Sequence, residues 1–241
     1  MKTLSVSILS VLLLVGCNKA QTEKPAVEKE SKTDAKKVSL TVRSDTTFTF
    51  ENYETGKLPD DWSQSFTGRG DGTEWKIIDD GGNKVMAQLS ADNPNYHFNV
   101  AVFNGIEAKN VELKVKMKGV KGRMDQGGGF VWRFTDKDNY YVVRANPLED
   151  NVVLYKVVNG KRTDLPLIGK GRTYGVDVEP LGDGWNELKL NVVKDLFTVY
   201  LNGKEIFKVK DETFTNKGKI GLWTKADAVS NFDDLQVKVF E

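Results

Sequence analysis

The sequence has few of the cysteine and histidine residues on which many catalytic and metal sites depend. Its 241 residues include one cysteine, Cys17, and one histidine, His97. A single cysteine excludes an intramolecular disulfide and a zinc site made of several thiolates. A serine–histidine–aspartate site would have to use His97, which lies in NPNYHFNV and outside any nucleophile-elbow pattern. We therefore expect His97 to be a structural or surface histidine.

Signatures of nucleotide and nucleic-acid binding are also missing. The glycine run GGGF at 127–130 opens a predicted strand, whereas phosphate-binding glycine loops lead into a helix. The formal net charge is +1, with acidic and basic residues interspersed along the chain. We predict no nucleic-acid partner, because proteins that bind nucleic acids carry a concentrated basic surface.

The most pronounced apolar run stands at the start of the chain. Leu4–Val15 follows a positively charged start and is too short for a stable transmembrane span. The residues LVGC at 14–17 resemble the lipobox of bacterial lipoproteins. By that resemblance, residues 1–16 are a signal peptide and Cys17 carries the lipid that attaches the chain to a membrane. The alternative is an ordinary signal peptide with an incidental cysteine. Asn18 favours sorting to the outer membrane, so we expect a cell-envelope location, facing the periplasm or the surface.

Composition then divides the remaining chain into two parts. Residues 17–45 are rich in Lys, Glu, Thr, Ser and Ala and have only scattered apolar residues. Such a segment cannot bury enough surface to offset its chain entropy, so we predict a disordered tether. A spacer role is favoured over contact with anionic lipid, because acids alternate with the lysines. Residues 46–241 are long enough for one domain with a sizeable core.

Short β-like runs recur about every ten residues throughout this domain, and turn signals such as Asn159-Gly160 and Asn202-Gly203 separate them. The runs are 46–51, 75–78, 84–90, 98–103, 111–118, 129–135, 139–146, 151–158, 174–179, 186–193, 196–202, 204–209, 218–224 and 231–240. No long stretch of helical period competes with them. The pattern predicts an all-β antiparallel fold, either a sandwich of two packed sheets or a barrel, and the sandwich is favoured.

The last run has a carboxylate in its apolar pattern. Leu235, Val237 and Val239 alternate with polar residues, and the same alternation places Asp233 on the inward side. A buried carboxylate needs donors or a cation. First and last strands of sandwiches are often neighbours, which would bring Asp233 near Glu51, and the two acids could hold a structural Ca²⁺. The favoured alternative is that Asp233 accepts hydrogen bonds from turn amides or pairs with a base.

The predicted strands are of two kinds. The run 111–118 alternates apolar residues with Glu and Lys, which predicts one packed and one solvated face. The runs GGGFVWRF (127–134) and NYYVVRAN (139–146) carry apolar or aromatic residues on both faces. Aromatic rings beside Arg and Asn on an open face suit a sugar. The alternative is a pair of central strands covered by loops. A register slip of one residue would exchange Arg133 and Tyr141 for their neighbours.

Four stretches resemble a known family: FTFENYETGKLPDDW (48–62) and the segments 129–162, 185–207 and 218–237. They resemble the laminin-G-like, concanavalin A-type β-sandwich domains of bacterial secreted proteins. Within that superfamily the closest resemblance is to 3-keto-disaccharide hydrolase-type domains, also described as family 16 glycoside hydrolase-like. The resemblance implies a jelly-roll sandwich and one of several roles, which include lectins, glycan-binding modules and glycosidases.

One feature of the glycosidases in that family is missing. Family 16 glucanases carry E-x-D-x-x-E on one strand, which places an acid and a nucleophile on one face. The nearest pattern here is Asp177-Val178-Glu179, which Pro180 follows at once and which lacks a third acid at the required spacing. The glucanase mechanism is therefore disfavoured, and solvent-facing charges are the preferred interpretation of this pair.

The sequence supports three functional hypotheses. The first is an envelope-anchored domain that binds a glycan or oligosaccharide, with candidate contacts at Arg133, Tyr141, Arg144, Asn146, Trp223, Asp227 and Asn231. The second is cleavage of a 3-keto-glycoside by hydrolysis or elimination. It needs one base next to a polarising cation, with Asp227, Asp233 or Glu149 as candidates. The third is a structural or protein-binding envelope domain.

Overall fold

Residues 40–241 are described by a computed structural model, and in this part of the chain there are sixteen β-strands and no helix. The strands are β1 (Val42–Phe48), β2 (Trp62–Gly68), β3 (Trp75–Asp79), β4 (Lys84–Gln88), β5 (His97–Ala108), β6 (Asn110–Lys121), β7 (Gly128–Asp136), β8 (Asn139–Asn146), β9 (Asn151–Val158), β10 (Lys161–Asp164), β11 (Val176–Asp177), β12 (Asn186–Val193), β13 (Leu196–Leu201), β14 (Lys204–Lys210), β15 (Gly218–Lys225) and β16 (Val229–Phe240). No helix in the described residues could cross a membrane. The expected signal peptide, Cys17 and most of the expected tether lie outside the described residues.

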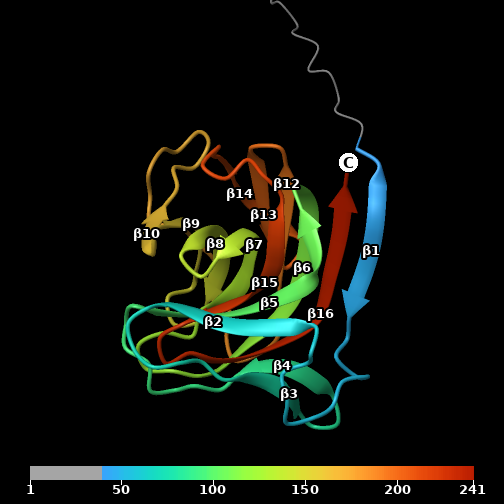
Figure 1. Cartoon of the computed structure of the whole chain (residues 1–241). Helices are drawn as coiled ribbons and strands as arrows, with labels where there is room; N and C mark the ends of the chain where they lie inside the picture. Colours follow the sequence, from blue (N-terminus) through green and yellow to red (C-terminus); the bar gives the residue numbers. More distant parts are fainter. Residues whose placement is uncertain (1–39) are drawn as a thin grey trace, which may run out of the picture. The chain divides into compact units, whose positions relative to one another are not determined.

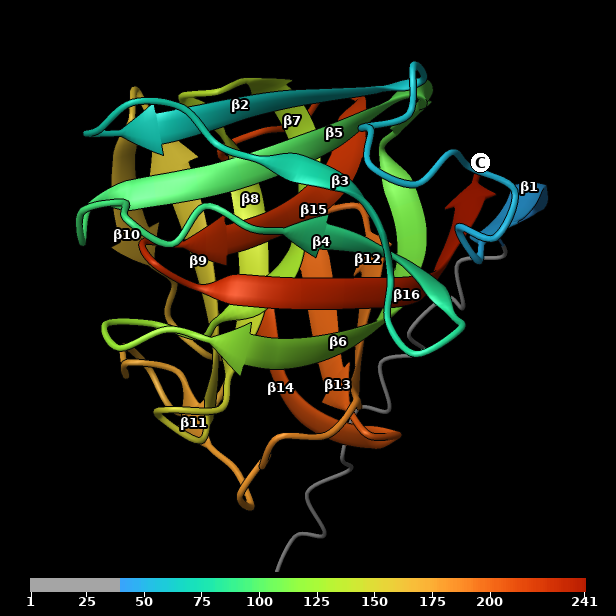
Figure 2. The ribbon, with the colours of Figure 1, turned by 90° about the horizontal axis from the view of Figure 1, so that it is seen from below.

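Two antiparallel sheets contain all sixteen strands (Figure 1). Sheet A has the order β14-β13-β12-β6-β16-β4-β3, with β1 paired to β16. Sheet B has the order β10-β9-β8-β7-β15-β5-β2, with β11 paired to β9. Figure 2 shows β16 of sheet A lying between β6 and β4. The predicted all-β, two-sheet antiparallel sandwich is confirmed.

The main core lies between the two sheets, where strand alternation directs apolar side chains from each sheet. In β6, Val111, Leu113 and Val115 point into this core, while the charged residues between them, Glu112 and Lys114, face outward, as the sequence predicts. Across the sandwich, the rings of Trp132 and Phe197 meet edge to face with centroids 5.3 Å apart. Such contacts join the sheets through apolar burial, the main favourable contribution to folding.

The first strand of the domain pairs with the last, as expected (Figure 1). The pairing runs from Val42, opposite Phe240, to Phe48, opposite Leu235. β1 therefore begins four residues before the domain boundary that composition suggests at 46. Because Arg43, an exposed residue, and its polar neighbours lie at the edge of sheet A, their composition resembles that of a tether.

A β-bulge in β16 reverses the expected orientation of Asp233. The register with β6 shifts between Asp233 and Gln236, and Asp234 has a φ of 48°. The extra residue makes Phe232 and Leu235 both core-facing, so Asp233 points to the outer side of sheet A. The prediction that Asp233 shares the inward side of Leu235 is therefore wrong, because simple alternation does not continue through a bulge.

Candidate functional site

The outer face of sheet B forms a second apolar cluster. Alternate residues of five strands build it, and each is at most 2% exposed: Phe98, Val100, Val102, Val131, Tyr140, Val142, Val153, Tyr155, Val157 and Trp223. The sequence prediction that β7 and β8 are apolar on both faces is confirmed. The indole of Trp223 and the ring of Tyr155 are nevertheless covered, so this part of the face is no open aromatic surface.

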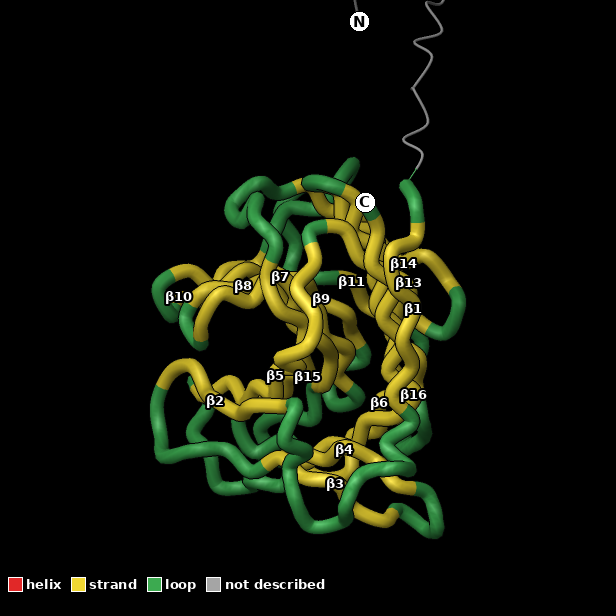
Figure 3. Tube along the Cα trace, turned by 45° about the vertical axis from the view of Figure 1, so that its right-hand side comes forward, coloured by secondary structure: helices red, strands yellow, loops and turns green. Residues whose placement is uncertain are grey.

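The face is covered because sheet B curls, so that its end strands β2 and β10 face each other on the same side of the fold (Figure 3). The hydroxyl of Tyr96 donates to the carbonyl of Gly160 at 3.1 Å and accepts the backbone N–H of Arg162 at 2.9 Å. On β2, the Thr67 hydroxyl lies 2.8 Å from that of Tyr140 on β8. These hydrogen bonds join segments 64 to 73 residues apart in sequence.

Arg162 lies across the aromatic interior of the curled sheet. Its guanidinium carbon is 4.4 Å from the ring centroid of Tyr155 and 5.0 Å from that of Phe98. These distances are within the range of cation–π attraction. The guanidinium therefore joins β9 and β5 from the two sides of the curl. The residue is half-buried and covers the rings below it.

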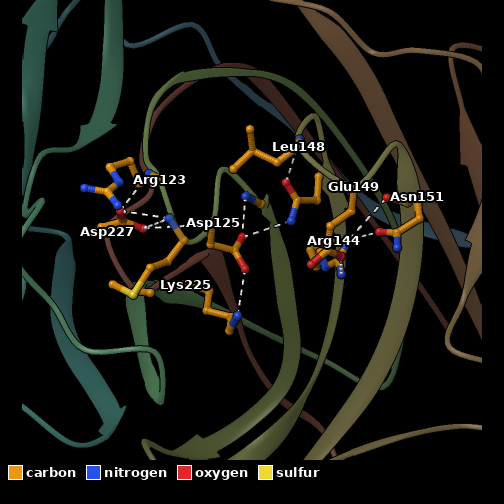
Figure 4. Close-up of polar contacts among 12 residues, drawn as sticks. Arg123, Asp125, Arg144, Leu148, Glu149, Asn151, Lys225 and Asp227 are labelled. Carbon is orange, nitrogen blue, oxygen red and sulfur yellow. Dashed lines mark hydrogen bonds and ion pairs between the residues drawn. The ribbon is translucent and has the colours of Figure 1, made fainter.

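Beyond this apolar cluster, the same outer face ends in a polar network (Figure 4). Its centre is Arg144 on β8, which is 1% exposed. The guanidinium donates to Glu149 at 2.6 Å, to the side chain of Asn151, and to the Tyr155 hydroxyl at 3.4 Å. Its carbon lies 5.9 Å from the ring centroid of Tyr174. A buried guanidinium with this many acceptors is held in one orientation.

The charges of this network stabilise one another. Burial lowers the pKa of Arg144, but the neighbouring Tyr155, Glu149 and Asp125 outweigh it and the net shift is upward. Burial raises the pKa of Glu149, whereas the charge and hydrogen bond of Arg144 lower it, and the net shift is downward. Glu149 is therefore an ionised hydrogen-bond acceptor at neutral pH, with a side chain that is 36% exposed.

A second ion pair is next to the first. Asp125, 1% exposed, accepts the ammonium of Lys225 at 2.8 Å, the side-chain amide of Asn146 at 3.2 Å and the backbone N–H of Gly127 at 2.7 Å. A Cβ on Gly127 would lie 2.7 Å from Asp125 Oδ1 and 3.2 Å from Arg144 Cδ. The glycine therefore allows the two ion pairs to lie against each other.

Asp227 fixes the loop that carries Asp125. Its carboxylate accepts the backbone N–H groups of Arg123 at 2.7 Å, Met124 at 3.1 Å and Asp125 at 3.0 Å (Figure 4). Burial raises the pKa of Asp227, but the three amides stabilise the charged form and lower the pKa overall. Since a lowered pKa makes the carboxylate a weak base, Asp227 acts here as an anchor for the loop.

The accessible part of this site consists of side chains around the buried ion pairs. Tyr174 is 53% exposed, and its hydroxyl lies 2.9 Å from that of Tyr155. Leu148 and Met124 are 48% and 50% exposed. Together with Glu149, they place an aromatic ring, apolar surface and a carboxylate on a rigid charged base. We call Arg144, Glu149, Asn151, Tyr155 and Tyr174 the Arg144 site.

The predicted contact residues divide between this site and other places. Arg144 and Asn146 lie in the polar network, and Asp227 holds its loop. Trp223 shares the outer face of sheet B but is completely buried. The sequence did not single out Tyr174, Asn151, Tyr155 or Asp125. Tyr174 begins the predicted run 174–179, but β11 covers only Val176–Asp177 and Tyr174 lies in the loop before it. Asn151 and Tyr155 lie on β9, the partner of β8, and Asp125 contacts Lys225, 100 residues away in sequence.

Three predicted contact residues lie elsewhere. Tyr141 faces the core between the sheets, where its ring contacts Trp132, and its hydroxyl donates to Asp211 at 2.6 Å. Arg133, 2% exposed, donates to backbone carbonyls, including that of Phe214 at 2.6 Å. The expectation that Arg133 and Tyr141 lie on an open sheet face therefore does not match the structure. Asn231 lies on sheet A.

Asp233 and Glu51 do come close, since both line one pocket on sheet A. Asp233 accepts the side-chain amide of Asn83 at 3.0 Å, and burial raises its pKa. Among residues 40–241, no group of three or more His, Cys, Asp or Glu is placed to hold a metal ion. The hydrogen bonds of Asp233 correspond to the favoured sequence interpretation, in which amides satisfy the carboxylate.

Comparison with known proteins yields similarity of fold. No family model and no curated protein matches the sequence. A carbohydrate-binding module (CBM66) from Bacillus subtilis is 18% identical over 74% of this chain and 95% of its own, with a TM-score of 0.53. The cellulose-induced protein Cip1 is 11% identical over 80% and 96%, with a TM-score of 0.53. A Bacillus subtilis protein with a galectin-like fold is 13% identical over 75% and 90%, with a TM-score of 0.50. The chain thus has a galectin-like β-sandwich fold.

Proposed function

We propose that residues 40–241 form a carbohydrate-binding domain and that the Arg144 site contacts the glycan. The observation that carries this proposal is the exposed ring of Tyr174 next to a carboxylate, Glu149, that a buried arginine holds in place. An aromatic ring can pack on the apolar C–H face of a sugar, while a fixed carboxylate accepts its hydroxyls.

The residues have different roles in this proposal. Tyr174 and Glu149 make the direct contacts, because they are the accessible members of the site. Arg144 is a positioning residue, since it is 1% exposed and both terminal nitrogens of its guanidinium donate to protein acceptors. A site whose polar groups are fixed before binding loses less entropy when the ligand arrives.

The similarity of fold to a carbohydrate-binding module supports the proposal. The expected signal peptide, residues 1–16, also suggests where in the cell this domain acts. With lipid on Cys17, the domain would be held at the cell envelope, at the outer membrane, by the segment that precedes β1. A single weak binding site benefits from such attachment, because confinement at a surface raises its effective concentration.

The pKa values favour binding over the 3-keto-glycoside cleavage hypothesis. The pKa values of Asp227 and Glu149 are both lowered, so each carboxylate is a poor proton acceptor. Asp233 has a raised pKa, which suits a base better, but it lies on sheet A and not at the Arg144 site. Product formation that Asp233→Asn abolishes would support the enzymatic hypothesis.

The test is calorimetric titration of the full chain with a panel of neutral glycans and 3-keto-glycosides, with chromatography to detect products. We expect saturable heat without product. Tyr174→Ala should weaken binding about tenfold, and Tyr174→Phe should retain most of the affinity, since the ring makes the main contact.

Tyr200→Ala, on the outer face of sheet A, is the matched control and should bind like the wild type. Equal affinity for Tyr174→Ala would overturn the site, and silence throughout the panel would favour the protein-binding hypothesis.

A further inference from the structure

A pocket of about 390 Å³ lies on the outer face of sheet A, on the other sheet from the Arg144 site. We call it the Trp185 pocket. It brings together the segment after β1, the turn between β3 and β4, strands β6 and β16, and the loop before β12. Its lining residues are Thr49, Glu51, Asn83, Lys116, Trp185, Asp233 and Asp234.

Trp185 is the exposed tryptophan of this protein. It is 38% exposed, whereas the other four tryptophans are between 0% and 4% exposed. An indole left in water forgoes a large part of its burial free energy. The ammonium of Lys118 lies 5.1 Å from the ring centroid and pairs with Asp80, so the ring is supported from the sheet. Trp185 also lines the pocket.

The polar groups of the pocket are held by the strands that carry them. The bulge at Asp234 turns Asp233 outward, where it accepts the side-chain amide of Asn83 at 3.0 Å and the backbone N–H of Asp234 at 2.7 Å. Asp234 pairs with Lys116 at 2.8 Å. Glu51 accepts the backbone N–H of Lys84 at 3.0 Å. The pocket therefore presents three carboxylates and one ammonium in a fixed arrangement.

The lining of the pocket has more acceptors than donors. Asp233, Asp234 and Glu51 supply three carboxylates, and Lys116 supplies one ammonium, which already pairs with Asp234. This surplus of acceptors favours a ligand rich in donors.

We propose that the Trp185 pocket binds an amino-sugar unit of a glycan, with a free ammonium group. The indole would pack on the C–H face of the sugar, and the carboxylates of Asp233 and Glu51 would accept its ammonium and hydroxyl groups. This inference rests on the proposed function in that the ligand is a glycan, but it concerns a separate site. An acidic sugar is disfavoured because three carboxylates would repel it. A divalent metal is disfavoured because Asp233 already accepts two hydrogen bonds and no three ligands converge in the described residues.

The experiment compares three β-1,4-linked oligomers of equal length: glucosamine, N-acetylglucosamine and glucose. Acrylamide quenching of tryptophan fluorescence in the full chain reports on Trp185, because the other four indoles are buried. We expect the glucosamine oligomer to protect Trp185 and the two neutral oligomers to protect it at least about tenfold more weakly. Equal protection by the neutral oligomers would overturn the amino-sugar assignment, as would protection by Ca²⁺ without protection by glucosamine.

Variants locate the binding. In calorimetry, Trp185→Ala and Asp233→Asn should each weaken the glucosamine oligomer about tenfold, while Trp185→Phe retains most of the affinity. Tyr200→Ala, outside the lining of the Trp185 pocket, is the control and should leave glucosamine binding unchanged. Glucosamine binding that survives both Trp185→Ala and Asp233→Asn would overturn the inference. Loss of the neutral-glycan affinity in Tyr174→Ala bears only on the proposed function, so the two can fail independently.

Discussion

At the scale of single residues, the most consequential feature is the burial of charge near the Arg144 site. Asp125 and Lys225 pair at 2.8 Å with side chains that are 2% and 12% exposed. Removing such charges from water is costly, and their attraction compensates only when further hydrogen bonds satisfy the carboxylate. Asn146 and Gly127 supply those bonds. In this pair the cost of removing both charges from water is therefore offset by their attraction and by these hydrogen bonds. Removal of one partner leaves the other charge uncompensated.

This balance gives the first prediction. Asp125→Asn should lower the free energy of unfolding by about 3 kcal/mol, because Lys225 would remain buried without its counter-charge. Urea unfolding followed by fluorescence measures the change. Asp138→Asn removes an exposed pair, in which Lys137 and Asp138 are 58% and 36% exposed, and should change stability by less than about 0.5 kcal/mol. Equal effects of the two substitutions would contradict the argument.

The second prediction concerns the pH dependence of Asp227. Its pKa in the folded state lies below the unfolded value, so the folded chain binds this proton more weakly. The stabilisation is therefore complete above the unfolded pKa of about 3.9 and is lost as the pH falls through the folded pKa. Asp227→Asn does not titrate. Its deficit in unfolding free energy relative to the wild type should be largest near about pH 6 and shrink toward about pH 2. A deficit that stays constant over this range would show that the hydrogen bonds from the three backbone amides are equally strong whether or not Asp227 is charged.

Residue chemistry in the sequence identified part of the site. Arg144, Asn146 and Asp227 could be named as polar groups beside buried strands, and Asp125 joins Asn146 and Asp227 in one network. The orientation of Asp233 could not be predicted, because a bulge is a local change in backbone conformation that the alternation of apolar and polar residues does not reveal. Tyr174 was missed for a different reason. Its partner Tyr155 is 19 residues away, and the end of β9, β10 and a loop lie between them.

At the scale of elements, interior strands were more predictable than edge strands. Runs such as 111–118 and 186–193 correspond closely to β6 and β12, because a buried face imposes strict alternation. β2 and β10 were missed. They are the end strands of sheet B and carry mostly polar residues, SQS within β2 and KRTD in β10. A strand at an edge pairs on one side and needs few apolar residues.

These two end strands close the curl of sheet B, and a third prediction follows for them. Tyr96→Phe removes the hydroxyl that joins Gly160 and Arg162 to the start of β5. We expect faster hydrogen exchange at the Arg162 amide and a loss of about 1 kcal/mol in unfolding free energy, because one side chain makes two hydrogen bonds. Amide exchange measured by NMR tests this. Tyr200→Phe, a half-exposed tyrosine on sheet A, is the control and should leave exchange at Arg162 unchanged. Unaltered exchange in Tyr96→Phe would show that ring packing alone closes the sheet.

At the scale of the whole domain, the two candidate sites lie on different sheets. The Arg144 site is on the outer face of sheet B, and the Trp185 pocket is on the outer face of sheet A. One domain could therefore contact two glycan segments at once. Two weak contacts on one rigid body raise the overall affinity without any new interaction, provided that both segments can reach. The Trp185 pocket draws on segments between residues 49 and 234, so it cannot form before the sandwich does.

The boundary of the domain gives the last prediction. A chain that starts at residue 40 includes all of β1, whereas one that starts at 46 loses the pairs of Val42, Ser44 and Asp45 with β16. The shorter chain should be less stable by about 1–3 kcal/mol, because it leaves part of β16 with unpaired backbone groups. Urea unfolding of both fragments, compared with the full chain, measures the difference. If the fragment from 40 unfolds like the full chain and the fragment from 46 does not, the first strand belongs to the sandwich and the tether ends before it. Equal stability of the two fragments would mean that the pairs at residues 42–45 contribute nothing and that composition alone had located the boundary.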